Sequence, residues 1–206
     1  MFTITLSIIV LTCLISVTAF NNQKIINDLI FYPPAISMRH QYYRFFTCGL
    51  IHADVMHLAF NMFTLYFFGR IMEAHYMGEL GLKHYWYLVL YAGAIIVANI
   101  PTYLKKMDDY NYRSLGASGG VCAVLFAFVL IRPWATIYVF FIPIPAILYA
   151  GLFLGYSVYM SKRGGDNVNH DAHFWGALFG VVLTIALHPD VVHTFLNELS
   201  QPRFDF

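Results

Sequence analysis

The residues best suited to chemistry are a serine set among glycines and a histidine far from it in the chain. Ser118 lies in the sequence GASGG, at the start of a charge-free stretch of seventeen residues, 115–131. Small neighbours leave its hydroxyl unshielded, but serine is a poor nucleophile unless a base lies beside it. His173, on another apolar segment, is the candidate base. The pair predicts nucleophilic attack on a carbonyl group.

The composition is that of a membrane protein. Of the 206 residues, 59% are hydrophobic and 11% are charged, with a mean hydropathy of +0.62. Soluble domains have about 45–50% apolar and about 25% charged residues. The length predicts a single domain, 1–206, and the net charge of +1 argues against a nucleic-acid partner. Cys13, Cys48 and Cys122 lie in or beside apolar runs, which predicts packing rather than disulfides.

Six apolar runs are candidates for membrane spans. Because backbone groups in hydrocarbon must satisfy their own hydrogen bonds, we expect helices. The runs do not alternate polar and apolar residues, which excludes a barrel. The first run is alternatively a signal peptide, since VTA at 17–19 resembles a cleavage site, although no basic residue precedes the run. The prediction is an all-α membrane protein with six transmembrane helices at about 3–20, 50–68, 84–101, 115–131, 145–161 and 171–187.

Two of the segments that connect the predicted spans have an unusual composition. Residues 21–49 contain a Pro-Pro break and six aromatic side chains, which predicts a loop in the headgroup region, where aromatics prefer to lie. Residues 134–145, WATIYVFFIPIP, are apolar and β-branched but interrupted by prolines. This pattern predicts an interfacial segment rather than a further span.

The charges of the loops bear on orientation. Six spans put both termini on the same side of the membrane. The loops on that side carry four basic residues and those on the opposite side carry eight. The positive-inside rule therefore predicts an N-terminus outside the cell.

Span parity brings the polar residues to one depth. Even-numbered spans all begin at the same membrane face, so Ser118, His173, His57 and Asn61 are expected to converge there. His57 and Asn61 are four residues apart and share a helix face, where they are either interhelical glue or donors to a developing oxyanion, together with the backbone N–H of Ser118. Asp171 is on a different face from His173, which favours a Ser–His dyad over a triad.

Two glycines share a helix face with the histidine. Gly176 and Gly180 follow His173 by three and seven residues. Such a small-residue face allows close helix contact. It is either an ordinary packing motif or the means of bringing His173 within about 2.6–3.2 Å of its partner, as general-base catalysis requires.

A metal site is another interpretation of the histidines. His170, Asp171 and His173 mimic ligand spacing, whereas His52 and His57 do not share a helix face. The chain has no HExxH motif. We therefore expect neither a metal nor a cofactor.

Three motifs together resemble those of the rhomboid intramembrane serine proteases. They are HADVMHLAFN at 52–61, GASG at 116–119 and AHFWGALFG at 172–180, in the family's order and on the matching spans. A GxSG motif alone also fits an unrelated hydrolase elbow. The resemblance covers about residues 40–187 and implies a six-transmembrane-helix rhomboid-like bundle.

The resemblance also implies roles for individual residues. Ser118 would be the nucleophile and His173 the general base, with His57 and Asn61 as oxyanion donors. Gly116 and the backbone of Ser118 would help to stabilise the transition state. The residues with supporting roles would be His52, Cys122, Gly176, Gly180, Glu73 and Arg44.

Two of these supporting residues match known family positions. Tyr43-Arg44 matches a Trp-Arg pair of the family's first loop, which would be half-submerged and comprise 21–49. Glu73 resembles an acidic position that ties loops together. Three residues depart from the family pattern: Tyr43 replaces a tryptophan, Cys122 replaces a tyrosine that packs against the base, and Asp171 replaces a small residue. A carboxylate at Asp171 would raise the pKa of the neighbouring histidine.

The implied function is an endopeptidase that cleaves transmembrane segments of membrane proteins, after a small residue near the outer membrane face. Its partners would be these substrates and the lipid bilayer. The family places the protein in the inner or plasma membrane with a cytoplasmic N-terminus, opposite to the charge count. One alternative is an inactive relative that binds membrane proteins for quality control, although such relatives usually lack the serine or histidine. The other is a small transporter or proton relay, which would need polar groups through the full membrane thickness.

Overall fold

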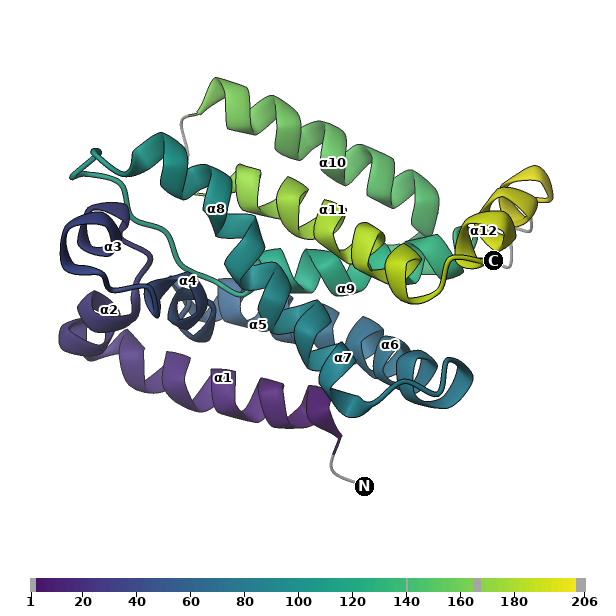
Figure 1. The fold of residues 1–206 in the computed structure, drawn as a ribbon, viewed down its shortest axis with the longest axis horizontal. Coiled ribbons are helices and arrows are strands. Elements are labelled where there is room, and N and C mark those ends of the chain that lie inside the picture. The colour runs from purple at the N-terminus through teal and green to yellow at the C-terminus, as the bar shows by residue number, and fades with distance from the viewer. Residues whose placement is uncertain (1–2, 140, 165–167, 203–206) are drawn as a thin grey trace.

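The computed structural model describes residues 3–139, 141–164 and 168–202 and is mostly helical (Figure 1). A 3-10 turn, Cys48–Leu50, follows the fourth helix. The elements in chain order are α1 Ile4–Phe20, α2 Gln23–Leu29, α3 Pro33–Arg39, α4 Arg44–Thr47, α5 Val55–Thr64, α6 Arg70–Ala74, α7 His84–Leu88, α8 Ala94–Lys106, α9 Ser118–Ile131, β1 Thr136–Val139, β2 Ile142–Pro145, α10 Ala146–Arg163, α11 His170–Leu187 and α12 Val191–Ser200.

Single π-helical turns join some of these helices into longer ones. A π-turn at Val89–Gly93 connects α7 to α8, so that one helix of 23 residues runs from His84 to Lys106. At 1.5 Å per residue it is about 34 Å long, more than the ~30 Å of bilayer hydrocarbon. Likewise, α5 passes through a π-turn at Leu65–Gly69 into α6. Both helices therefore extend beyond the ends predicted from their apolar runs.

Two helices in the described residues are long and apolar enough to cross a membrane. They are His84–Lys106 and α11. Two further apolar helices, α1 and α9, are shorter. The prediction for α11, at 171–187, agrees with the structure to within one residue.

The centre of the bundle is α9. All residues from Gly119 to Leu130 are buried, which explains why this helix is apolar on every face. It packs against α11 and α8, and also contacts α10 and α5. In Figure 1, α1 and α10 lie on opposite flanks, with α9 and α11 between them.

The structure corrects one of the predicted connections and shows the backbone of the other. Residues 21–49, expected to be a loop, contain α2, α3 and α4. Pro33 and Pro34 start α3 instead of breaking structure, because proline fits the first turn of a helix. Residues 134–145 contain an antiparallel hairpin in which Thr136 pairs with Pro145 and Val139 with Ile142. The fold is therefore predominantly helical, as expected for an all-α protein, with one small hairpin where the β-branched and aromatic residues of β1 favour extended backbone.

Candidate active site

Ser118 and His173 lie next to each other although 55 residues separate them in the chain. Ser118 is the first residue of α9, and His173 lies in the first turn of α11. The Oγ atom of Ser118 is 2.9 Å from Nε2 of His173. A serine hydroxyl that donates to an imidazole nitrogen at this distance is placed for proton removal by that base.

Glycines make this approach sterically feasible. A Cβ atom at Gly176 would lie 2.2 Å from the carbonyl oxygen of Gly119, and one at Gly180 would lie 2.2 Å from that of Ala123. The backbones of α9 and α11 are thus in direct contact along two turns. Any side chain at these positions would hold the helices apart, so the glycines set the distance between Ser118 and His173.

The turn before Ser118 also depends on a glycine. Gly116 has φ +118°, a conformation that residues with a Cβ atom rarely adopt. A Cβ atom there would lie 2.6 Å from Cε1 of His57. The N–H of Gly116 donates to the carbonyl of Cys48 at 2.9 Å. This N–H is therefore already paired, and the absence of a side chain at Gly116 leaves room for the ring of His57.

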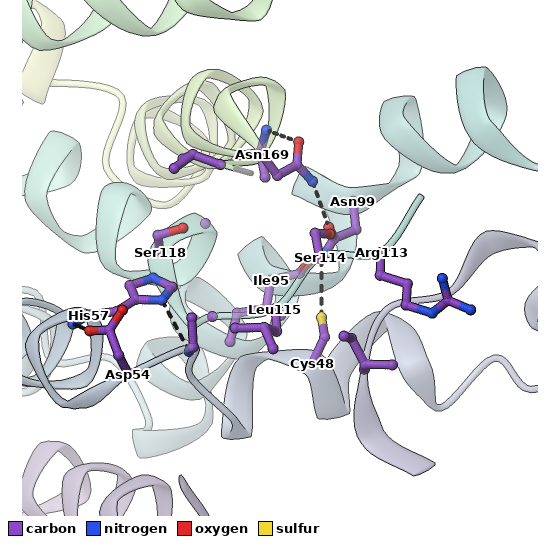
Figure 2. A pocket seen from close by; sticks show the side chains of 16 residues that line it. Cys48, Asp54, His57, Ile95, Asn99, Arg113, Ser114, Leu115, Ser118 and Asn169 are labelled. Carbon is purple, nitrogen blue, oxygen red and sulfur yellow. Dashed lines mark hydrogen bonds between the residues drawn. The ribbon is translucent and has the colours of Figure 1, made fainter. Parts of the chain in front are cut away.

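His57 lies in the first turn of α5. Its backbone N–H donates to the carboxylate of Asp54 at 2.8 Å, an N-cap that starts the helix there. Its ring nitrogen Nδ1 accepts a long hydrogen bond from the N–H of Ala53 at 3.5 Å. The ring borders the same cavity as Ser118, as Figure 2 shows.

Asn61 lies one turn further along α5 and is buried. Its amide nitrogen donates to the carbonyl of His57 at 2.9 Å, within the same helix. Asn61 is not among the described residues that border the cavity next to Ser118. One of its two amide hydrogens is thus already used inside α5.

His52 precedes α5, in a loop and not in the helix predicted from the apolar run. Its Nε2 accepts from the N–H of Ala117 at 3.3 Å, and its Nδ1 lies 2.9 Å from Oγ of Ser16. The Ser16 hydroxyl donates to the carbonyl of Leu50, so Nδ1 of His52 must carry the proton and donate to it. This buried neutral imidazole connects α1 to the peptide just before Ser118.

The aromatic support of His173 comes from a residue that sequence reasoning missed. Phe153, on α10, lies with its ring centroid 5.5 Å from that of His173. The ring of His170 packs edge-on against the ring of His173, with the two centroids 5.6 Å apart. Cys122, expected at the position of a supporting tyrosine, is buried in α9. The aromatic ring beside His173 therefore comes from Phe153 of α10, because the thiol of Cys122 cannot provide one. In the sequence, Phe153 is one phenylalanine within an apolar run and was assigned no role.

Asp171 lies in the first turn of α11 and is held by residues of two other helices. Its carboxylate accepts hydrogen bonds from Lys105 of α8, at 2.6 Å, and from the hydroxyl of Ser161 of α10. Asn169 caps the start of α11 and also accepts from Thr102 of α8 at 3.0 Å. Both residues hold the first turn of the histidine-bearing helix between its neighbours.

The supporting residues Glu73 and Arg44 lie outside this cavity. The buried carboxylate of Glu73 accepts from the N–H groups of Ile4 and Thr5 and from the Thr5 hydroxyl, at 2.7, 2.9 and 2.7 Å. It therefore anchors the start of α1 to α6. The buried Arg44 donates to the carbonyls of Asn27 and Ile30, both at 2.8 Å, which anchors α2 to α4.

A cavity of about 610 Å³ opens beside Ser118. Figure 2 shows Ser118 and His57 on one side of it, Asn99 and Asn169 on another, and the guanidinium of Arg113 pointing away from Ser118. Among the described residues, no three potential metal ligands come together. Ser118 and the side chains of His57, Asn99 and Asn169 border this cavity, whereas His173 contacts Ser118 without bordering it. A serine next to an imidazole and hydrogen-bond donors is an arrangement suited to acyl transfer.

Comparison with known proteins identifies the family. The model of the family described as "Rhomboid domain" matches residues 39–190, most of the chain. The chain belongs to the rhomboid family. It is 30% identical to RHOMBOID-like protein 12, mitochondrial, of Arabidopsis thaliana, over 66% of this chain and 44% of that protein. It is 33% identical to Rhomboid-like protein 11, chloroplastic, of the same plant, over 69% of this chain and 51% of that protein.

A more distant relative is the human Presenilin-associated rhomboid-like protein, mitochondrial, which is 29% identical over 63% of this chain and 34% of that protein. The chain thus spans about half or less of the length of these relatives. Rhomboids are integral membrane proteins. Family membership therefore makes this chain a predominantly helical protein of the membrane, as its composition predicted.

Proposed function

We propose that this rhomboid-family chain is an intramembrane serine endopeptidase that cleaves transmembrane segments of membrane proteins. The observation that supports this most is the 2.9 Å contact between Ser118 Oγ and His173 Nε2 at the edge of a cavity. Rhomboids are generally serine proteases, and this chain has a serine and a histidine at the positions that match the family's motifs.

The proposed reaction begins with attack of Ser118 Oγ on the carbonyl carbon of the scissile peptide, while its proton passes to Nε2 of His173. The tetrahedral intermediate then collapses, the C–N bond breaks, and His173 donates the proton to the departing amine. A water molecule, deprotonated by the same nitrogen, hydrolyses the resulting ester and frees Ser118. No metal or redox step is needed for this balance.

The negative charge on the carbonyl oxygen needs donors close to Ser118. The N–H of Ser118 is suited to this role, because the first N–H groups of a helix have no acceptor within it. The ring of His57 borders the cavity and is the second proposed donor. Asn61 is the third proposed donor. Its side chain does not border the cavity, so its remaining amide hydrogen reaches the oxyanion only if the side chain turns towards Ser118.

We propose a six-span topology for the same protein. The six spans would be α1, the helix from Val55 through α6, His84–Lys106, α9, α10 and α11. With this arrangement, α9 and α11 both start at the membrane face where the dyad lies. We further propose a cytoplasmic N-terminus in an inner or plasma membrane, and reporter fusions at the two termini test this orientation.

Purified protein in detergent, mixed with a generic transmembrane substrate, tests the activity. We expect cleavage by the wild type and none by Ser118→Ala or His173→Ala. The matched controls are Ser157→Ala, a buried serine of α10, and His193→Ala, an exposed histidine of α12, and both should cleave normally. Undiminished cleavage by Ser118→Ala would refute the mechanism, and substrate binding without cleavage by the wild type would favour a binding protein.

A further inference from the structure

A second cavity, of about 590 Å³, lies between the α2–α4 region and the connection from α8 to α9. Three arginines border it: Arg39 at the end of α3, Arg44 at the start of α4, and Arg113 in the connection. Asp28 is the single acidic residue among the described residues of its wall. The wall thus carries three positive charges against one negative charge.

None of these arginines forms an ion pair in the described part of the chain, where the salt bridges involve other residues. Arg39 is exposed at the rim. The guanidinium of Arg113 lies over the ring of Tyr32, 4.5 Å from its centroid, and donates only weakly to the carbonyl of Tyr110, at 3.4 Å. Stacking on Tyr32 fixes the orientation of this guanidinium and leaves donors for an anion.

Arg44 contributes a buried positive charge to the wall of this cavity. Its side chain is 6% exposed, and it donates hydrogen bonds to the carbonyls of Asn27 and Ile30 and to the amide oxygen of Gln41, all uncharged groups. A buried charge without a counter-ion is costly. An anion in the cavity would compensate it, so this buried guanidinium is an independent indication of what the cavity binds.

The rim of the cavity is apolar and aromatic. Met38, Tyr43 and Tyr110 border it and are 66%, 49% and 59% exposed. The hydroxyl of Tyr110 contacts the sulfur of Met38 at 3.4 Å, which joins the two sides of the rim. Aromatic side chains of this kind prefer the boundary between lipid headgroups and acyl chains. A ligand that suits both parts of the site has an anionic head and an apolar tail.

We propose that this cavity is a binding site for an anionic phospholipid, with the phosphate held by Arg39 and Arg113 and the acyl chains against the apolar rim. The site adjoins the catalytic cavity, because Arg113 and Ile30 border both. Phe31 and Ser114 also form a backbone bridge between the two regions, with hydrogen bonds of 3.0 and 3.2 Å. The site is distinct from the dyad, and its ligand is not a substrate of the proposed reaction.

Binding is measured on the full chain in a non-ionic detergent, by calorimetric titration with a short-chain phosphatidylglycerol. A basic residue near an anionic lipid surface contributes about fivefold in affinity. We expect Arg39→Gln and Arg113→Gln to raise the Kd about fivefold each, and the double variant to raise it more than either single variant, because both arginines contribute to binding of the same phosphate. The double variant is first checked for wild-type thermal stability, and Arg39→Gln, at an exposed position, serves alone if Arg113→Gln does not fold.

The matched control is Arg163→Gln. Arg163 is an exposed arginine that also lies over a tyrosine ring, Tyr159, but it does not border the cavity. We expect this variant to bind phosphatidylglycerol like the wild type. An equal loss of affinity in the control would indicate general surface charge and overturn the proposal, as would unchanged binding by the double variant.

Three competitors identify the ligand. Short-chain phosphatidylcholine, which is neutral overall, should bind at least tenfold more weakly than phosphatidylglycerol. If inorganic phosphate displaces the lipid at equal concentration, the site is one for free anions and the lipid proposal is wrong. If a short acidic peptide displaces it equally well, the site is one for acidic protein segments and the proposal is likewise overturned. None of these readouts requires proteolysis, so they stand or fall separately from the proposed activity.

Discussion

Replacing Gly176 by alanine tests whether helix contact positions the dyad. The new Cβ would lie 2.2 Å from the carbonyl oxygen of Gly119, whereas carbon and oxygen atoms need about 3.3 Å. The contact involves backbone, so α11 must move away from α9 by about 1 Å. Because Ser118 adjoins Gly119 and His173 is one turn from Gly176, their 2.9 Å separation would grow towards ~4 Å.

A misplacement of about 1 Å costs roughly 100-fold in rate, so we expect Gly176→Ala to lose about two orders of magnitude in kcat. The stability should change less. Overpacking costs about 1–3 kcal/mol, and the higher helix propensity of alanine offsets about 0.5–1 kcal/mol of that. The assay is the initial rate of cleavage of a quenched fluorescent transmembrane peptide, accompanied by labelling of Ser118 with a fluorophosphonate and by thermal unfolding.

Two other glycines serve as controls for this experiment. Gly155, on α10, has open space where a Cβ would lie, with no atom within 4 Å, so Gly155→Ala should be slightly stabilising and fully active. Gly180→Ala meets the carbonyl of Ala123 at 2.2 Å but lies two turns from His173, so we expect a similar loss of stability with a smaller loss of rate. A folded Gly176→Ala variant that cleaves within threefold of the wild-type rate would refute the reasoning.

Three further predictions concern residues around the dyad. Gly116→Ala should remain folded but lose about 100-fold in kcat, because its Cβ displaces His57 and strains the turn; fluorophosphonate labelling at the wild-type rate would contradict this. Glu73→Gln should lower the free energy of unfolding by about 2–3 kcal/mol in denaturant titrations, because the amide cannot accept all three hydrogen bonds; a Glu73→Asp variant is the milder comparison. Ser16→Ala leaves the Nδ1 proton of His52 without its acceptor and should cost about 1–3 kcal/mol; an unchanged midpoint would rule out the proposed hydrogen-bond chain.

The dyad was predictable because its signals are local and repeated. The long apolar runs indicate helices, and their order along the chain predicts that Ser118 and His173 lie at one membrane depth. Gly176 and Gly180 share a face with the histidine by helical periodicity alone. In the structure the two side chains are 2.9 Å apart, and their catalytic roles remain proposals.

The surroundings of the dyad were not predictable in the same way. The ion pair of Asp171 with Lys105 of a different helix could not be predicted from sequence neighbours, and the effect of Asp171 on the histidine stays a prediction. The prediction that places His52 in a span follows from the apolar residues around it, whereas the N-cap at Asp54 starts the helix only after it. The proline pair at 33–34 suggests a break, although proline also suits a helix start.

The sequence by itself determined the class of protein, the apolar helices, the small residues that let them touch, and the residue types of the Ser118–His173 pair, because composition and helical period follow directly from residue order. Only the tertiary structure decided which groups support them: Phe153 against the ring of His173, Ser16 and His52 behind Ala117, and a cavity bordered by three arginines. These contacts join residues far apart in the chain. They depend on how the helices pack and rotate against each other, and spacing along a single helix does not identify which residue of another helix faces it.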